Sequence, residues 1–408
     1  MFKCLGPDGS SHRFAGTLPR LIADGEVCQH CDNEVHRHQG PLLTRDYGFH
    51  LRLAARALLD VGNGLTYTEA AARARATAGR GPYGGVQPNG TLVAEWIDVL
   101  APLLVGAHAE RSWPETVVVD STNFIISNVR MGTSRQAFAI VAIYGYAQQS
   151  TRGQLLGLYA THEHFAESYG EAFAYVEALG NQRSGATGAW TPPTMMLTDG
   201  EWALLNGMTG YWNAGTGPDC GTGKAPYAKR CEWHLRKNAK LALKKAGITN
   251  LDDPIQLILD TAFQSPAGWD AFCLAAQDLP QLARYVKRND AQVRDQVARR
   301  AALPQHHSSA ALETVLERVR QQIERRTFAF RNQRRTNLLL GLMRNHEIRV
   351  DDLDHYTELL REAARAAGGR IQYQRRGYCT DRAFDPRPLA PSPHRIRSTL
   401  SDGGAPRK

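Results

Sequence analysis

Two short apolar runs, each followed at once by an aspartate, constrain the fold of this chain more than any other feature. The valine-rich run at 115–119 leads into Asp120, and a second run at 193–198 leads into Asp199, which a glycine follows. Apolar and β-branched runs of this length are typical of buried strands. Each aspartate is therefore expected at the end of a strand, with its carboxylate emerging from the sheet.

A third acid lies in a different local setting. Glu313 belongs to a segment in which apolar residues recur at three and four positions, which is typical of an amphipathic helix. Glu317, one turn further along the same face, is the competing candidate. A single acid is most often a solvated or capping residue, so only the joint pattern of the three acids carries functional weight.

Three carboxylates in one site favour a hard divalent cation, because Mg²⁺ prefers oxygen ligands. A polynucleotide phosphate would add negative charge that the cation has to balance. Two ions about 3.5–4 Å apart would activate an attacking oxygen and stabilise a leaving one in an in-line displacement. Asp120, Asp199 and Glu313 are therefore expected to bind Mg²⁺ or Mn²⁺ together.

The segments between the first two acids have the pattern of an α/β fold. Segments 136–146 and 154–161 are apolar, and the polar stretch 147–153 between them reads as a hairpin loop. Residues 165–179 have helical periodicity and end at Gly180, ahead of the second acid. The order strand, strand, strand, helix, strand, helix predicts a mixed sheet with the acids clustered at one edge of it.

Two further motifs accompany the acids. Cys231-Glu232-Trp233-His234 follows the second acid, and a basic, aromatic segment at 325–332 follows the third. Together with the acids, these motifs resemble the DDE transposases of bacterial insertion sequences, in the Mutator-like group, along most of the chain. The resemblance implies a ribonuclease H-like catalytic core, an active-site role for His234, and Glu313 rather than Glu317 as the third acid.

The domain organisation follows from this resemblance and from composition. The second and third acids lie 114 positions apart, against 79 for the first two, which leaves room for an inserted domain with helical periodicity. The Pro-rich and Arg-rich C-terminus predicts disorder. The expected units are a zinc-ribbon-like module at 1–42, an all-α helix-turn-helix domain at 43–108, the first part of the core at 109–234, a helical insertion at 235–305, the third-acid helix and C-terminal helices of the core at 306–366, and a basic tail at 367–408.

Cysteine spacing predicts a structural zinc site near the N-terminus. Cys28 and Cys31 form a Cys-x-x-Cys pair, which lets two thiolates bind one Zn²⁺ from a tight turn. Cys4 and His36 are expected to complete the tetrahedron. Unliganded cysteines and a redox pair are the alternative interpretations. Other histidines could replace His36 as the fourth ligand: His12, His30 and His38.

Three helices are expected between the zinc module and the core, at 46–59, 67–76 and 90–104. Thr66 and Glu69 form a capping box at the start of the second. Short helices at this spacing favour a helix-turn-helix, and the resemblance to the transposases implies that this unit recognises transposon ends. The third helix carries acids and no Lys or Arg, which is unusual for a helix that reads bases, so generic three-helix packing is the alternative.

The formal net charge of +9 favours a polyanionic partner, expected to be double-stranded DNA at transposon ends and target. Basic residues crowd the segments after the second and third acids, where they would contact phosphates, although each run could also be a solvated helix face. The chain is expected to form a homo-oligomer on DNA, with no membrane partner, in the cytoplasm at the nucleoid. The candidate DNA-binding residues are Arg236, Lys237, Arg318, Arg325, Arg326 and Arg331.

Two functions from different classes fit these features. An active transposase would cleave the element's ends, and the freed 3′ hydroxyl would then attack target DNA. The alternative is a catalytically silent, host-adopted DNA-binding regulator derived from a transposase. Because the acids and the Cys-x-x-His motif are all intact, the sequence favours the enzyme. A nuclease without a joining step would use the same metal chemistry, but the expected zinc and helix-turn-helix modules disfavour it.

Overall fold

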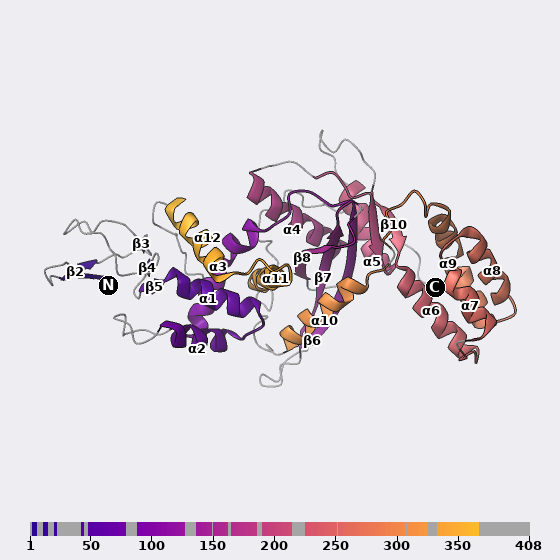
Figure 1. The fold of residues 1–408 in the computed structure, drawn as a ribbon, viewed down its shortest axis with the longest axis horizontal. Helices are drawn as coiled ribbons and strands as arrows, with labels where there is room; N and C mark the ends of the chain where they lie inside the picture. The colour runs from indigo at the N-terminus through magenta and orange to yellow at the C-terminus, as the bar shows by residue number, and fades with distance from the viewer. Residues whose placement is uncertain are drawn as a thin grey trace, which may run out of the picture.

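The protein contains one five-stranded mixed sheet among many helices. The computed structural model describes residues 2–5, 11–14, 20–22, 42–44, 48–78, 88–126, 136–148, 150–161, 165–185, 190–213, 225–250, 252–306, 308–324 and 333–366. Figure 1 shows the sheet near the middle of an elongated molecule, with the N-terminal helices toward one end and α6 to α9 at the other. The α/β class predicted from the sequence is confirmed.

The central sheet has the strand order β10-β9-β6-β7-β8. β6, β7 and β8 pair in antiparallel fashion, whereas β9 joins β6, and β10 joins β9, in parallel. The predicted strands at 136–146 and 154–161 are confirmed. The strand bounds are β6 (Thr116–Ile126), β7 (Gln136–Tyr146), β8 (Gln154–Thr161), β9 (Met195–Thr198) and β10 (Tyr227–Arg230).

Helices cover both faces of this sheet, because successive strand residues point to opposite sides. Val117 and Val119 are buried in one hydrophobic cluster with Phe173 of α4, whereas Val118 belongs to a second cluster with Leu316 of α10. The first face is therefore covered by α4 and α5, and the second by α10 and α11. The bounds are α4 (Ala166–Ser184), α5 (Trp202–Asn213), α10 (Ala310–Glu324) and α11 (Gln333–Glu347).

The N-terminal helices pack into the same core as α11. α1, α2, α3 and α12 share one hydrophobic cluster with α10, α11 and the sheet. The predicted capping box is confirmed, since the Thr66 N–H donates to Glu69 Oε2 at 2.8 Å and the Glu69 N–H to Thr66 Oγ1 at 3.3 Å. The bounds are α1 (Leu51–Gly62), α2 (Tyr67–Ala78), α3 (Gly90–Ala107) and α12 (Leu353–Ala366).

α3 is a core helix rather than an outlying one. Its inner side, including Trp96 and Leu100, is buried, and Asp98 forms a two-pronged ion pair with Arg335 of α11. Among the described helices, α3 is the one that is long and apolar enough to cross a membrane, judged by length and composition alone. The helix-turn-helix interpretation stays a prediction. Asp98, one of the acids that make α3 unusual for a helix that reads bases, binds Arg335 of α11.

Short strands precede these helices. They form a two-stranded sheet, β1-β2, and a three-stranded sheet, β3-β4-β5. The helix predicted from residue 46 begins only at Leu51, because residues 48–50 pair with β4 as β5. The bounds are β1 (Phe2–Leu5), β2 (Ser11–Phe14), β3 (Arg20–Ile22), β4 (Leu42–Thr44) and β5 (Gly48–His50).

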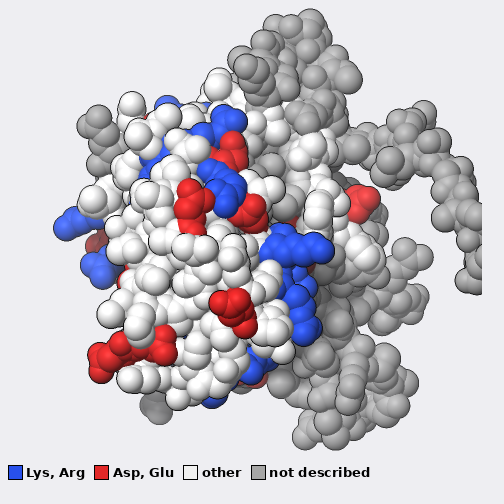
Figure 2. Space-filling model, turned by 90° about the vertical axis from the view of Figure 1, so that its right-hand side faces the viewer, with Lys and Arg blue, Asp and Glu red and all other residues white. Residues whose placement is uncertain are grey.

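Four helices between β10 and α10 build a hydrophobic core of their own. Trp269, Phe263 and Phe272 are fully buried there. The surface at this end carries basic and acidic side chains interspersed, as Figure 2 shows. The bounds are α6 (Glu232–Lys245), α7 (Pro254–Thr261), α8 (Pro266–Ala276) and α9 (Pro280–Ala298).

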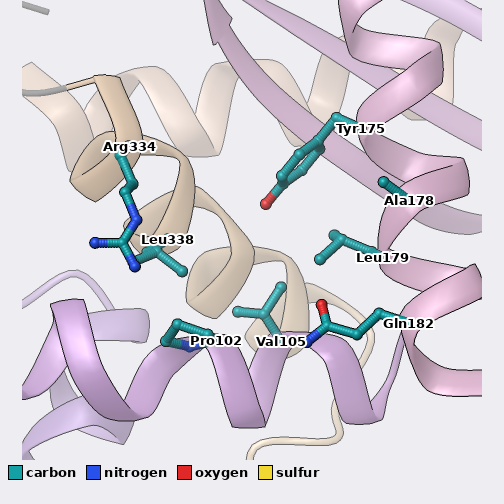
Figure 3. A pocket seen from close by; sticks show the side chains of 8 residues that line it. All are labelled: Pro102, Val105, Tyr175, Ala178, Leu179, Gln182, Arg334 and Leu338. Carbon is teal, nitrogen blue, oxygen red and sulfur yellow. The ribbon is translucent and has the colours of Figure 1, made fainter. Parts of the chain in front are cut away.

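A small cavity of about 90 Å³ lies where α3, α4 and α11 meet. Pro102, Val105 and Leu338 form apolar parts of its lining, and the Tyr175 hydroxyl points into it (Figure 3). No described side chain or backbone group hydrogen-bonds that hydroxyl. A water molecule takes up about 30 Å³ in liquid water, so this cavity is large enough to hold water.

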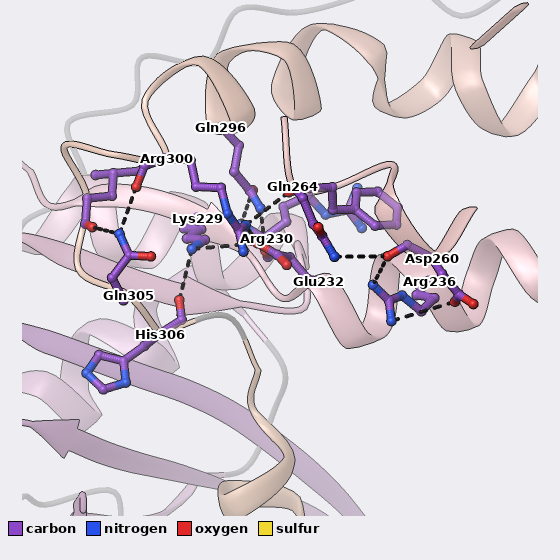
Figure 4. A network of polar contacts seen from close by, with 12 residues as sticks. Lys229, Arg230, Glu232, Arg236, Asp260, Gln264, Gln296, Arg300, Gln305 and His306 are labelled. Carbon is purple, nitrogen blue, oxygen red and sulfur yellow. Dashed lines mark hydrogen bonds and ion pairs between the residues drawn. The ribbon is translucent and has the colours of Figure 1, made fainter. Parts of the chain in front are cut away.

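β10 is joined to the segment before α10 by a buried lysine. Lys229 is 1% exposed, and its Nζ donates to the backbone oxygen of His306 at 2.9 Å and lies 3.8 Å from Glu232 Oε1 (Figure 4). The His306 ring in turn stacks on Tyr146 of β7. Burial lowers the pKa of Lys229 to about 8, and only part of that effect is offset by the carboxylate of Glu232.

Two glycines on α5 provide a matched test of the α4–α5 packing. A Cβ on Gly207 would lie 2.4 Å from the Ala166 carbonyl oxygen and 2.8 Å from Tyr169 Cβ, whereas a Cβ on Gly210 would meet nothing within 4 Å. Gly207→Ala should therefore destabilise the protein by about 1–3 kcal/mol through overpacking. Gly210→Ala should stabilise it by roughly 0.4–1 kcal/mol. Urea unfolding measures both, and equal effects would contradict the packing described.

Lys229→Met should change how stability depends on pH. In the wild type, the unfolded lysine binds a proton up to pH 10.5 and the folded one only up to about 8, so the free energy of unfolding should rise between these values, on the order of 2–3 kcal/mol from this group. The variant should lack this rise. Unfolding at pH 7, 8, 9 and 10 in both proteins isolates the lysine, because the other groups are shared. If the free energy of unfolding changed with pH in the same way in both proteins, the lowered pKa of Lys229 would be contradicted.

Candidate active site

The first two acids stand level on neighbouring parallel strands. The β6–β9 ladder pairs Thr116 with Met195 and Val118 with Leu197, partners that are 79 positions apart. Asp120 and Asp199 are also 79 positions apart, so each lies two residues beyond the Val118–Leu197 pair. Because side chains alternate along a strand, extending this register brings both carboxylates to the face that bears Val118 and Leu197.

Asp120 does not end its strand, contrary to the sequence prediction. β6 continues for six residues to Ile126, because β7 pairs with it along its whole length. The parallel partner β9 is much shorter and ends at Thr198. Asp120 therefore lies where β6 is no longer paired with β9 but is still paired with β7. This point is level with the start of the Asp199 turn, and β6 is a central strand of the sheet.

The third acid approaches from the helix that covers this face. Leu312 and Leu316 of α10 are buried in the cluster that contains Val118 and Leu197, and this packing directs Glu313, which is half-buried, toward the same region. Glu317, one turn later, is exposed and accepts a hydrogen bond from Gln321 of its own helix. α10 is further tied to β6 by Arg320, whose Nη2 donates to Thr122 Oγ1 at 2.8 Å.

The Cys-x-x-His motif joins α6 to the start of α10. Cys231 is fully buried at the N-terminus of α6, and both the backbone N–H and the hydroxyl of Ser309 approach its Sγ at 3.3 Å. The same hydroxyl lies 3.4 Å from His234 Nδ1 and 3.4 Å from Glu313 Oε1. His234 Nε2 lies 3.3 Å from Glu313 Oε1. Since one hydroxyl has a single proton for three neighbours, these groups form a coupled network.

Electrostatics link this network to Asp120. Burial raises the pKa of Asp120 to about 6, the amide hydrogen bond from Ser121 opposes the rise, the charges of Asp199 and Glu313 add to it, and His234 lowers it. The pKa of His234 is raised, first by its hydrogen bond with Cys231, against the effect of burial. Asp199, Glu313 and His234 are thus all near enough to act on the Asp120 carboxylate.

The donor set has the chemistry of a hard-cation site, but the side chains do not converge on one point. Asp120 Oδ1 accepts from the Ser121 N–H at 2.8 Å, and Asp199 Oδ1 accepts from the Glu201 N–H at 2.8 Å. Across the described part of the chain, no three His, Cys, Asp or Glu side chains lie close enough to hold one ion. Carboxylate oxygens suit Mg²⁺ or Mn²⁺. Because each aspartate has a second carboxylate oxygen, these amide hydrogen bonds are compatible with metal binding, but sharing one ion requires the acidic side chains to move closer together.

Several candidate DNA-binding residues are engaged in contacts within the protein. Arg236 Nη2 donates to the Asp260 backbone oxygen at 3.0 Å, and Arg318 makes a two-pronged ion pair with Glu347. Lys237 Nζ lies 4.6 Å from the centroid of the Trp233 ring. Charges of both signs alternate over the surface of the α6–α9 end (Figure 2). The remaining candidates lie outside the described residues: Arg325, Arg326 and Arg331.

The predicted zinc ligands stay a prediction. Cys4 lies on β1, where its backbone is paired with His12 of β2. The other expected ligands, Cys28, Cys31 and His36, lie outside the described residues. The register of β1 with β2 places the backbone of Cys4 opposite that of His12, one of the alternative fourth ligands.

Sequence reasoning missed two residues at the site. Ser309 is 2% exposed, and its carbonyl accepts from the Glu313 N–H at 3.1 Å at the start of α10. Two serines just before an amphipathic helix are a capping signal that could have identified it. Arg230 lies in the basic segment that follows the second acid, yet its Nη2 donates to the Asp199 backbone oxygen, and no periodic signal marks that role.

Comparison with known proteins does not place the chain in a family. No protein-family model matches it, and no curated protein does either. The interpretation of this site therefore depends on its residues and geometry.

Proposed function

We propose that the chain is a DDE-type DNA transposase that binds the ends of a mobile element and catalyses metal-dependent strand cleavage and strand transfer. The observation that carries this proposal is the parallel register of β6 and β9, which sets Asp120 level with Asp199 on the face covered by the helix of Glu313. The acids have the residue types and order along the chain of the DDE motif.

The proposed core is ribonuclease H-like and interrupted by a helical insertion. A central strand bearing the first acid, a shorter parallel neighbour leading to the second, and a helix with the third on one face support that finer assignment. The α6–α9 unit, with its separate hydrophobic cluster, supports the insertion. The N-terminal helices would belong to the part that recognises DNA ends.

In this proposal, Asp120, Asp199 and Glu313 supply the carboxylate oxygens of the site. A divalent cation held there would polarise a phosphate and make a water or a 3′ hydroxyl a better nucleophile. His234 holds Glu313 through Nε2 and is itself held through Nδ1 by Ser309, so the imidazole fixes the third acid against α6.

Double-stranded DNA is the proposed polymeric substrate. The net charge of +9 favours binding to a polyanion, and phosphate contacts would give an affinity that falls steeply with salt. Two element ends must be held together for transfer, so we propose a homo-oligomer on DNA. A silent DNA-binding regulator would share this affinity but not the dependence on the three acids.

Substitution of the acids should abolish catalysis without abolishing DNA binding. Asp120→Asn, Asp199→Asn and Glu313→Gln should each lower cleavage and joining of the element's ends with Mg²⁺ or Mn²⁺ by more than about 100-fold, because changes in the outer shell of a metal site alone cost about 10–100-fold. End binding, measured by fluorescence anisotropy at fixed salt, should change little.

Glu317→Gln is the matched control for this experiment. Glu317 lies one turn beyond Glu313 on α10 and is exposed, so its variant should keep wild-type rates. Full activity in all three acid variants would contradict the enzyme. End binding with no cleavage by the wild type, in either metal, would favour the silent regulator.

The N-terminal module should contain one structural Zn²⁺ per chain. Cys28→Ser should lose that metal in elemental analysis of purified protein, because removing one thiolate breaks a four-ligand site. Cys273→Ser, on α8 and away from the module, is the control and should retain full zinc. Zinc-free wild-type protein that keeps its N-terminal strands would contradict this site.

A further inference from the structure

The turn that carries Asp199 is held by the end of β10. Arg230, the last residue of that strand, donates from Nη2 to the Asp199 backbone oxygen at 3.0 Å. The next residue, Cys231, donates its N–H to the Thr198 backbone oxygen at 2.7 Å. Two successive residues thus bind two successive carbonyls, so the path of the chain at the second acid depends on β10.

A glycine makes this contact possible. Gly200 has a φ of +91°, and a Cβ at that position would lie 2.4 Å from Arg230 Nε and 2.7 Å from its Cζ. The guanidinium therefore lies close against the backbone at Gly200, just after Asp199. Any other residue would both strain the turn and push the guanidinium away.

Helix α9 holds Arg230 in turn. Asn289 Oδ1 accepts from Arg230 Nη1. Gln296 forms hydrogen bonds with both the N–H (3.0 Å) and the carbonyl (3.1 Å) of Arg230 (Figure 4). Asn289 is 3% exposed and Gln296 is 2% exposed. Asn289 is itself fixed, because its Nδ2 donates to the Tyr285 carbonyl at 2.7 Å.

Stability alone gives little reason for this arrangement. Buried amides and guanidinium groups cost free energy unless they are hydrogen-bonded, and apolar side chains of similar size usually serve a helix–sheet contact as well or better. Burial also lowers the pKa of Arg230, and its buried Nε has no hydrogen-bond partner among the described residues. Asn289 and Gln296 both bind Arg230, and Arg230 in turn binds the Asp199 turn.

We propose that Arg230 is a positioning residue: gripped by Asn289 and Gln296 of α9, it fixes the turn that presents Asp199, and the α6–α9 unit thereby sets the geometry of the acids. The metal-binding part of this inference rests on the function proposed above. The positioning of the turn stands on the contacts themselves.

Hydrogen exchange tests the positioning without metal or DNA. The amides of Gly200 and Glu201 are bonded to Thr198 Oγ1 and Asp199 Oδ1, so they report on the turn. Arg230→Met and Asn289→Ala should each speed exchange in a peptide spanning 198–202 by about tenfold, as local opening becomes easier. Peptides from β7 should not change.

Arg294→Gln is the matched control. Arg294 lies on α9 between the two gripping residues, is about half exposed, and pairs with Asp270 and Asp290 rather than with β10. Its variant should exchange like the wild type. Asn289→Ala decides the question if Arg230→Met does not fold, because Asn289 acts on the turn only through Arg230.

Binding of Mn²⁺ alone, followed by electron paramagnetic resonance, tests the link to the acids. Arg230→Met and Asn289→Ala should weaken Mn²⁺ binding by about tenfold or more, while Arg294→Gln should not. Faster exchange with weaker Mn²⁺ binding supports the whole inference. Unchanged exchange in both variants, or faster exchange with unchanged Mn²⁺ affinity, overturns it. Faster exchange in a protein whose wild type binds no Mn²⁺ supports the positioning of the turn and overturns the proposed function.

Discussion

β6 and β9 pair in parallel over three residue pairs, and the relation between Asp120 and Asp199 depends on that short ladder. A slip of one residue would turn one carboxylate to the opposite face, which packs in an apolar cluster with α4 and α5. The ladder is short because β9 ends at Thr198, while β6 continues to Ile126 paired with β7 on its other side. At Asp120, β6 is therefore no longer paired with β9.

The second and third acids are connected through one stretch of chain, the end of β10 and the first turn of α6. Arg230 holds the Asp199 turn, Cys231 meets Ser309, and His234 contacts Glu313. The same stretch binds α9 through buried polar side chains and a salt bridge between Glu232 and Arg300. A buried network of this kind costs stability where it is incomplete, as at Arg230 Nε, which has no hydrogen-bond partner among the described residues, and its bonded members fix the geometry. The α6–α9 unit is therefore part of the structure that holds the acids in place.

Local patterns predicted much of this fold. The strands at 136–146 and 154–161, the capping box at Thr66, and the helical pattern after β10 are properties of neighbouring residues, so periodicity and capping chemistry reveal them. Asp120 was wrongly placed at a strand end because pairing with β7, 11 residues long, is a tertiary property that no apolar run reports. Ser309 and Arg230 act across gaps of 78 and 31 positions, to Cys231 and Asp199, and such contacts have no sequence period.

The joint binding of one divalent ion by Asp120, Asp199 and Glu313 is tested most directly by a crystal structure with Mn²⁺, using anomalous scattering to locate the metal. The expected result is a manganese peak between the ends of the paired stretch of β6 and β9 and the first turn of α10, with a carboxylate oxygen of each of the three acids coordinated to it at about 2.0–2.3 Å. A structure at saturating Mn²⁺ in which the metal is absent from this region, or in which any of the three acids lies beyond coordinating distance of it, would contradict it.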